Sequence, residues 1–111
     1  MEHHNADVDN MIRNAIASKN IIKFTYQGRQ RIAEPHVYGV HSGRKQLLVY
    51  QIGGDSTTGD LPNWRRFNVD EISSIQIASQ SFNVRQSLLS GKHSVFDEIL
   101  AIAAIRDEIA E

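Results

Sequence analysis

Strand-like alternation gives way to one helical turn in the stretch Trp64-Arg65-Arg66-Phe67-Asn68-Val69-Asp70-Glu71-Ile72. Two aromatic side chains and two arginines stand together here, immediately after a loop rich in glycine and aspartate. Guanidinium groups bind phosphates, and aromatic rings stack on planar groups. The stretch therefore predicts a small β-domain that holds an anionic or planar ligand.

Four further segments with strand-like patterns share the chain with this stretch. The turn at Gln27-Gly28-Arg29-Gln30 separates two of them, and Pro35 marks a bulge or an edge position because proline cannot donate to a β-ladder. The five predicted strands cover residues 21–26, 31–40, 46–52, 64–69 and 74–78. Closure into a barrel removes the open edges that short strands leave in a flat sheet. We therefore expect a mainly β fold, a five-stranded SH3-like or Sm-like barrel over residues 21–78.

Helices are predicted on both sides of this barrel. One helix face is apolar over residues 7–18, which predicts an N-terminal helix that closes the barrel. A capping box precedes a wide apolar stripe from Val95 to Ile109, which predicts a C-terminal amphipathic helix. The chain thus divides into a barrel domain with its helix (1–82) and a linker with the C-terminal helix (83–111), within one compact unit.

Composition is typical of a cytoplasmic globular domain. The chain has 111 residues, of which 41% are hydrophobic and 23% are charged. There is no cysteine, hence no disulfide framework and no thiolate metal site, and no apolar run is long enough to span a bilayer. The net charge of −1 conceals a basic middle, because residues 19–67 carry eight Lys and Arg against three Asp and Glu. A basic face suits phosphate-bearing partners, while a solvated surface is the usual meaning of scattered charge.

Taken in order, these segments resemble a WYL domain. The matching pieces run from about Ile12 to Phe82 and comprise residues 12–16, 22–26, 31–35, 47–50 and 66–72. The sequence departs from the family at Gln46-Leu47-Leu48, where only the leucine of the Trp-Tyr-Leu triplet is kept, and at Glu71, where an arginine is usual. The resemblance implies an Sm-like barrel with a basic pocket that senses nucleic acid or nucleotides, in regulators of transcription, DNA-damage response or phage defence.

Four residues are the candidate ligand contacts. Arg31 and Arg66 match the basic positions of the WYL family, and a guanidinium binds phosphate through two parallel hydrogen bonds. Tyr26 and Trp64 are the aromatic candidates, for a hydroxyl contact and for base stacking. The alternatives are surface salt bridges for the arginines and core packing for the aromatic residues. Arg65 and Arg66 alternate across their strand, so only one of them faces a pocket, and the resemblance favours Arg66.

No arrangement in the sequence indicates catalysis. The chain lacks a recognisable nucleophile–base pair, a metal-ligand spacing and a glycine-rich phosphate loop, so we expect no enzyme activity, no metal and no cofactor. Two functions remain open. The first is a ligand-sensing module that binds a short single strand of nucleic acid or a nucleotide and acts through a partner regulator protein. The second is a protein-interaction module, a homodimer that buries the C-terminal helix.

Overall fold

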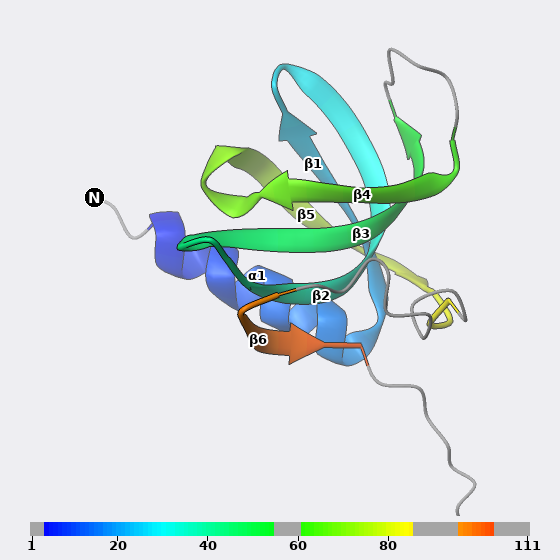
Figure 1. The fold of residues 1–111 in the computed structure, drawn as a ribbon. Coiled ribbons are helices and arrows are strands. Elements are labelled where there is room, and N and C mark those ends of the chain that lie inside the picture. Colours follow the sequence, from blue (N-terminus) through cyan, green and yellow to red (C-terminus); the bar gives the residue numbers. More distant parts are fainter. Residues whose placement is uncertain (1–3, 55–60, 86–95, 104–111) are drawn as a thin grey trace, which may run out of the picture.

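The computed structural model describes residues 4–54, 61–85 and 96–103. One N-terminal helix is followed by six strands, which confirms the mainly β prediction and the predicted helix at the N-terminus. The elements are α1 (His4–Ser18), β1 (Asn20–Tyr26), β2 (Arg29–His41), β3 (Arg44–Gly54), β4 (Asn63–Asn68), the 3-10 turn η1 (Val69–Glu71), β5 (Ile72–Ser81) and β6 (Glu98–Ile102). Figure 1 shows α1 lying against the strongly curved sheet.

All six strands form one antiparallel sheet. Its order is β4-β3-β2-β1-β5, and β6 pairs with β2 beside this path. The predicted order of strands, with η1 between β4 and β5, is confirmed. Among the residues that the structure describes, no ladder joins β4 to β5, so the pairing leaves these two strands as edges. Closure into an SH3-like barrel is therefore not confirmed by strand pairing.

The long strand β2 bends the sheet and belongs to both of its halves. Its register with β3 shifts between Pro35 and Val37, which confirms the bulge that the proline predicts. Before the bend, β2 pairs with β1 as far as Ala33. After it, the stretch from Val37 to Val40 pairs with β6 on the side that β1 has left.

The predicted C-terminal helix is wrong where the structure describes it. Glu98–Ile102 is strand β6, not helix, although the apolar spacing favours a helix. The cause is tertiary: once β1 has turned away, the edge of β2 would stay unpaired, and a strand rich in isoleucine satisfies its backbone groups. Residues 86–95 and 104–111, which hold the predicted linker and the rest of the helix, lie outside the described residues.

The main core lies between α1 and the concave side of the sheet. Val8, Ile12, Ala15 and Ile16 of the predicted apolar face of α1 are all buried there. The sheet contributes Ile22, Phe24, Tyr26, Ala33, Tyr38, Leu47, Val49, Phe67 and Ile72. A second, smaller cluster on the opposite side of the sheet holds Val37 and Leu48, against which Trp64, Val84 and Phe96 pack. Within the described part of the chain, no helix is long and apolar enough to cross a membrane.

Candidate ligand-binding site

Neighbouring residues of β4 point to opposite faces of the sheet. Phe67 pairs with Leu47 and lies in the main core, so Arg65, two positions before it, points to the same concave face. Trp64 packs on the smaller cluster, and Arg66 lies on that convex face as well. The structure therefore brings Arg65, in place of Arg66, onto the face that carries the main core.

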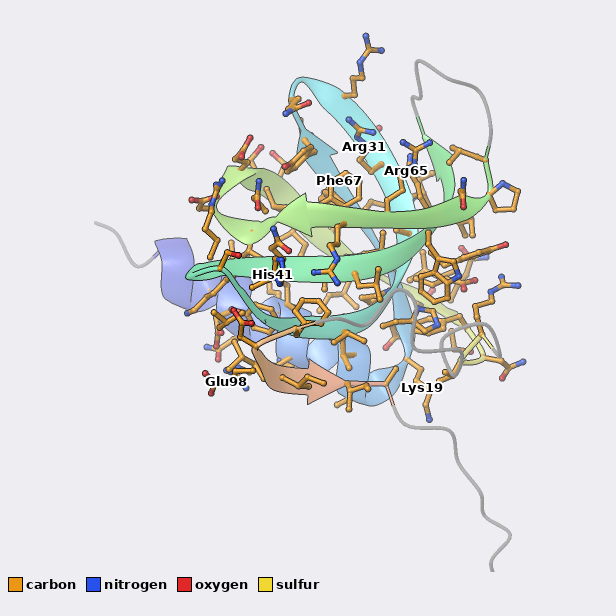
Figure 2. The ribbon with its side chains drawn as sticks, in the orientation of Figure 1. Lys19, Arg31, His41, Arg65, Phe67 and Glu98 are labelled. Carbon is orange, nitrogen blue, oxygen red and sulfur yellow. The ribbon has the colours of Figure 1, made fainter. Side chains whose placement is uncertain are left out.

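Arg31 lies on the concave face in an aromatic setting. Arg31 is buried, and its guanidinium carbon lies 5.7 Å from the centre of the Tyr26 ring and 5.4 Å from the centre of the Phe67 ring. Nη2 donates a hydrogen bond of 3.2 Å to the carbonyl oxygen of Tyr26. Two adjacent rings and a backbone acceptor hold the planar cation in one orientation. Figure 2 shows Arg31, Phe67 and Arg65 at the same end of the sheet.

Tyr26 serves this arrangement as a support. Its ring meets Phe67 edge-on, with centroids 4.6 Å apart, and its hydroxyl accepts a hydrogen bond of 3.2 Å from the backbone N–H of Asn68. The hydroxyl is thus engaged with the chain itself. The structure places Tyr26 in the core beneath Arg31, in line with the packing alternative.

Gln51 is a buried polar residue on the concave face that sequence reasoning missed. It is fully buried, and its Nε2 donates to the carbonyl oxygen of Gly53 at 3.0 Å, which fixes the orientation of the amide. Its Oε1 is buried and has no hydrogen-bond partner among the described residues. Such an acceptor needs an explanation in a folded protein. The available signal was alternation, since a glutamine stands where Leu47 and Val49 predict another apolar side chain.

Arg66 lies on the convex face beside the segment that precedes β6. Its guanidinium carbon is 4.2 Å from the centre of the Phe96 ring, and Nη1 donates to Oε1 of Gln46 at 3.0 Å. Burial lowers the pKa of the Arg66 guanidinium from its usual value. The sheet separates this cation from Arg31, so the structure places the two predicted arginines on opposite faces.

Trp64 belongs to an aromatic group on the same convex face. Its ring meets His36 at 4.8 Å and Tyr50 at 5.2 Å between centroids, both edge-on. Arg85 covers Tyr50, with its guanidinium carbon 4.4 Å from the ring centre, and pairs with Glu34. Trp64 and Tyr26 thus lie on opposite faces of the sheet, and the four predicted contacts form two groups.

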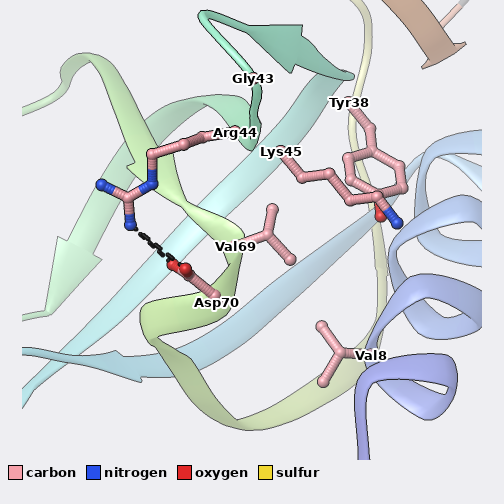
Figure 3. Close-up of a pocket in the computed structure, with 7 residues that line it drawn as sticks. All are labelled: Val8, Tyr38, Gly43, Arg44, Lys45, Val69 and Asp70. Carbon is pink, nitrogen blue, oxygen red and sulfur yellow. Dashed lines mark hydrogen bonds and ion pairs between the residues drawn. The ribbon is translucent and has the colours of Figure 1, made fainter.

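A cavity of about 250 Å³ opens at the far end of the sheet. There Arg44 forms an ion pair of 2.9 Å with Asp70, between exposed side chains (Figure 3). The hydroxyl of Tyr38 is turned away to Oδ1 of Asp9, at 2.7 Å, and this hydrogen bond lowers the pKa of Asp9. The cavity is lined by Val8, Tyr38, Gly43, Arg44, Lys45, Val69 and Asp70. Of its charged groups, Arg44 is paired with Asp70, and Lys45 is the second cation of the lining.

The described residues contain no group of three or more His, Cys, Asp or Glu side chains that could hold a metal ion. Among the described residues, most hydrogen bonds between side chains join arginines, amides and carboxylates. Groups of these kinds bind and orient ligands.

Comparison with known proteins finds a solved structure with a similar fold. No protein-family profile and no curated protein sequence matches the chain. Among solved structures, proteasome accessory factor B/C (PafBC) of Arthrobacter aurescens is similar to it, with a TM-score of 0.56 at 20% sequence identity. The similar region covers 81% of this chain and 14% of the PafBC chain. At this identity the likeness shows a shared fold, and the chain spans a small part of the length of PafBC.

Proposed function

We propose that this chain is a WYL-like regulatory module that binds a nucleotide or a short single strand of nucleic acid on the concave face of its sheet. The sheet would act as a small Sm-like barrel with its ligand at one mouth. The observation that carries the proposal is Arg31, a buried residue whose guanidinium lies beside the contacting rings of Tyr26 and Phe67. The resemblance of the sequence to a WYL domain supports a regulatory role, and the fold shared with PafBC is compatible with it.

The chemistry of the concave face matches the parts of a nucleotide. Arg31 and Arg65 supply guanidinium donors, which bind phosphate oxygens in pairs. Gln51 supplies an amide oxygen suited to an N–H donor, such as the exocyclic amine of a base. The aromatic rings beside Arg31 hold its guanidinium in place, which reduces the entropy lost on binding.

Substitutions on the two faces of the sheet test this proposal. We expect Arg31→Ala and Arg65→Ala each to weaken binding by about 1.5–3 kcal/mol, because each removes a charge-assisted hydrogen bond. Arg66→Ala is the matched control on the convex face, and we expect it to leave the affinity within about threefold of wild type. Fluorescence anisotropy with labelled mononucleotides and a short oligonucleotide measures all three.

Two results contradict the proposal. The first is the absence of binding to any nucleotide or oligonucleotide by the wild-type chain at low salt. The second is a loss of affinity in Arg66→Ala that exceeds the loss in Arg65→Ala, which would move the site to the convex face.

Self-association is the second candidate function. Ile99 and Ile102 of β6 are each 48% exposed, which is unusual for two large apolar side chains on one short strand. We expect Ile102→Glu to lower the association of two copies if this strand lies in a homodimer interface. Light scattering at high micromolar concentration measures it, and a wild-type chain that stays monomeric excludes the homodimer.

A further inference from the structure

Glu34 and Arg85 form an ion pair on the convex face, apart from the proposed ligand site. The carboxylate accepts hydrogen bonds from Nε and Nη2 of Arg85 at 2.8 and 2.9 Å. The guanidinium also lies over the ring of Tyr50, 4.4 Å from its centre. Two parallel hydrogen bonds and an aromatic face are features that recognise a planar guanidinium and that an ammonium group cannot match.

The receptor half of this contact is built into the sheet. Glu34 on β2 stands opposite Tyr50 on β3 in the ladder, and Trp64 on β4 meets the ring of Tyr50 edge-on at 5.2 Å. His36 donates from Nδ1 to the backbone oxygen of Glu34 at 2.9 Å, which holds the bulge in place. These groups are therefore fixed by neighbouring strands whether or not a guanidinium is bound.

Arg85, by contrast, comes from the segment that follows β5 and is open to solvent. Its side chain is 43% exposed, whereas the side chain of Glu34 is 6% exposed. The Glu34 carboxylate is thus a buried part of the site, whereas the Arg85 guanidinium lies at the surface of the site. Removal of the cation leaves a buried carboxylate without its partner, which is costly and favours a replacement of the same charge.

We propose that Glu34, Tyr50 and Trp64 form an arginine-binding site, which the chain fills with its own Arg85 and an arginine-bearing peptide of a partner fills when Arg85 leaves. The buried carboxylate of Glu34 selects a ligand of positive charge. The two parallel hydrogen bonds select a planar guanidinium. The site is independent of the concave face, so failure of one proposal leaves the other standing.

Substitution of the internal ligand tests the site in the full chain. In Arg85→Ala, we expect an acetylated Gly-Arg-Gly amide peptide to bind saturably and to change the emission of Trp64, the single tryptophan of the chain. The Gly-Lys-Gly peptide should bind at least about tenfold more weakly, because an ammonium group lacks the planar fork. Wild-type protein, whose site is filled, should bind the arginine peptide at least about tenfold more weakly than Arg85→Ala.

Three controls make the result specific. Adding Glu34→Gln or Tyr50→Leu to Arg85→Ala should each abolish the response, and two such variants guard against one that fails to fold. Arg44→Ala removes a guanidinium from an exposed carboxylate at the other end of the sheet and leaves Arg85 in place. The Gly-Arg-Gly peptide should therefore not raise the melting temperature of this variant. The proposal is overturned if Arg85→Ala gives no saturable response, if the lysine peptide binds equally well, or if Glu34→Gln leaves the response intact.

Discussion

His36 is buried completely, and its two ring nitrogens have fixed roles. Nδ1 donates to the backbone oxygen of Glu34, and Nε2 accepts the backbone N–H of Arg85 at 3.1 Å. Protonation of Nε2 would replace that acceptor with a second N–H. Burial accordingly lowers the pKa of His36 below its usual value, against the opposing effect of the Glu34 carboxylate.

This setting predicts that acid destabilises the protein through His36. The unfolded chain takes up the proton first, at a pKa of about 6.5, so the free energy of unfolding falls as pH drops below that value. We expect His36→Gln, which keeps an acceptor for Arg85, to flatten the pH dependence between about pH 6.5 and the lowered pKa of the folded state. Urea unfolding of both proteins across this range measures the difference, and parallel curves would contradict the assignment.

The ion pair at Arg85 gives a second prediction at this scale. The Glu34 carboxylate raises the pKa of Arg85, chiefly through their hydrogen bonds. We expect Arg85→Ala to lower the free energy of unfolding by about 1–3 kcal/mol, less than for a fully buried pair because the guanidinium is partly solvated. Arg44→Ala, whose ion pair is exposed, should lower the free energy of unfolding by less than Arg85→Ala does in the same denaturation measurement. Equal costs would contradict the role of burial.

Alternation along the sequence predicts which neighbouring residues point to opposite faces of a strand. It does not predict which of the two faces lies in the core. The sequence indicates that Arg65 and Arg66 point to opposite sides, which the pairing of β4 with β3 confirms. Which side carries the core depends on Phe67 meeting Leu47 across the ladder, a contact between distant parts of the chain. Local patterns hold no information on such a choice, since a shift by one residue exchanges the two faces.

Among the elements, β6 is the one whose secondary structure the apolar spacing of the sequence does not predict. Its apolar spacing fits a helix, yet the unpaired edge of β2 selects a strand. Gly39 makes the contact possible, because a Cβ at this position would lie 2.5 Å from the carbonyl oxygen of Glu98 and 2.7 Å from the Phe96 ring. By contrast, the strands from β1 to β5 and η1 were predictable, because turns and alternation mark them within a few residues.

Gly39→Ala should therefore detach β6 from β2. We expect a loss of about 1–3 kcal/mol in the free energy of unfolding and faster hydrogen exchange at the N–H of Ala103, which donates to the carbonyl oxygen of His36. Gly53→Ala is the control within β3, since its Cβ would meet Ile32 at ordinary contact distances of 3.6 and 3.7 Å. Retained protection of Ala103 in Gly39→Ala would show that the close contact is not required.

At the scale of the whole molecule, charge is distributed in favour of an anionic ligand. The net charge is only −1, but the cations gather in residues 19–67, which contain Arg31 and Arg65, while the flanking parts are acidic. Overall charge thus offers no general attraction for nucleic acid. Binding must come from local contacts between guanidinium groups and phosphates, and such contacts release counterions.

The salt dependence of binding follows from the number of these contacts. With two phosphates neutralised, by Arg31 and Arg65, the affinity for a short single strand should fall about sevenfold between about 50 and 200 mM salt, from a slope of about −0.7 per phosphate. Arg65→Ala should roughly halve this slope, because one contact is lost, whereas Arg66→Ala should leave it unchanged. Anisotropy titrations at four salt concentrations measure the slopes. A slope near zero in the wild-type chain would show that its ligand is recognised without phosphate, and the aromatic groups and the amide of Gln51 would then carry the binding.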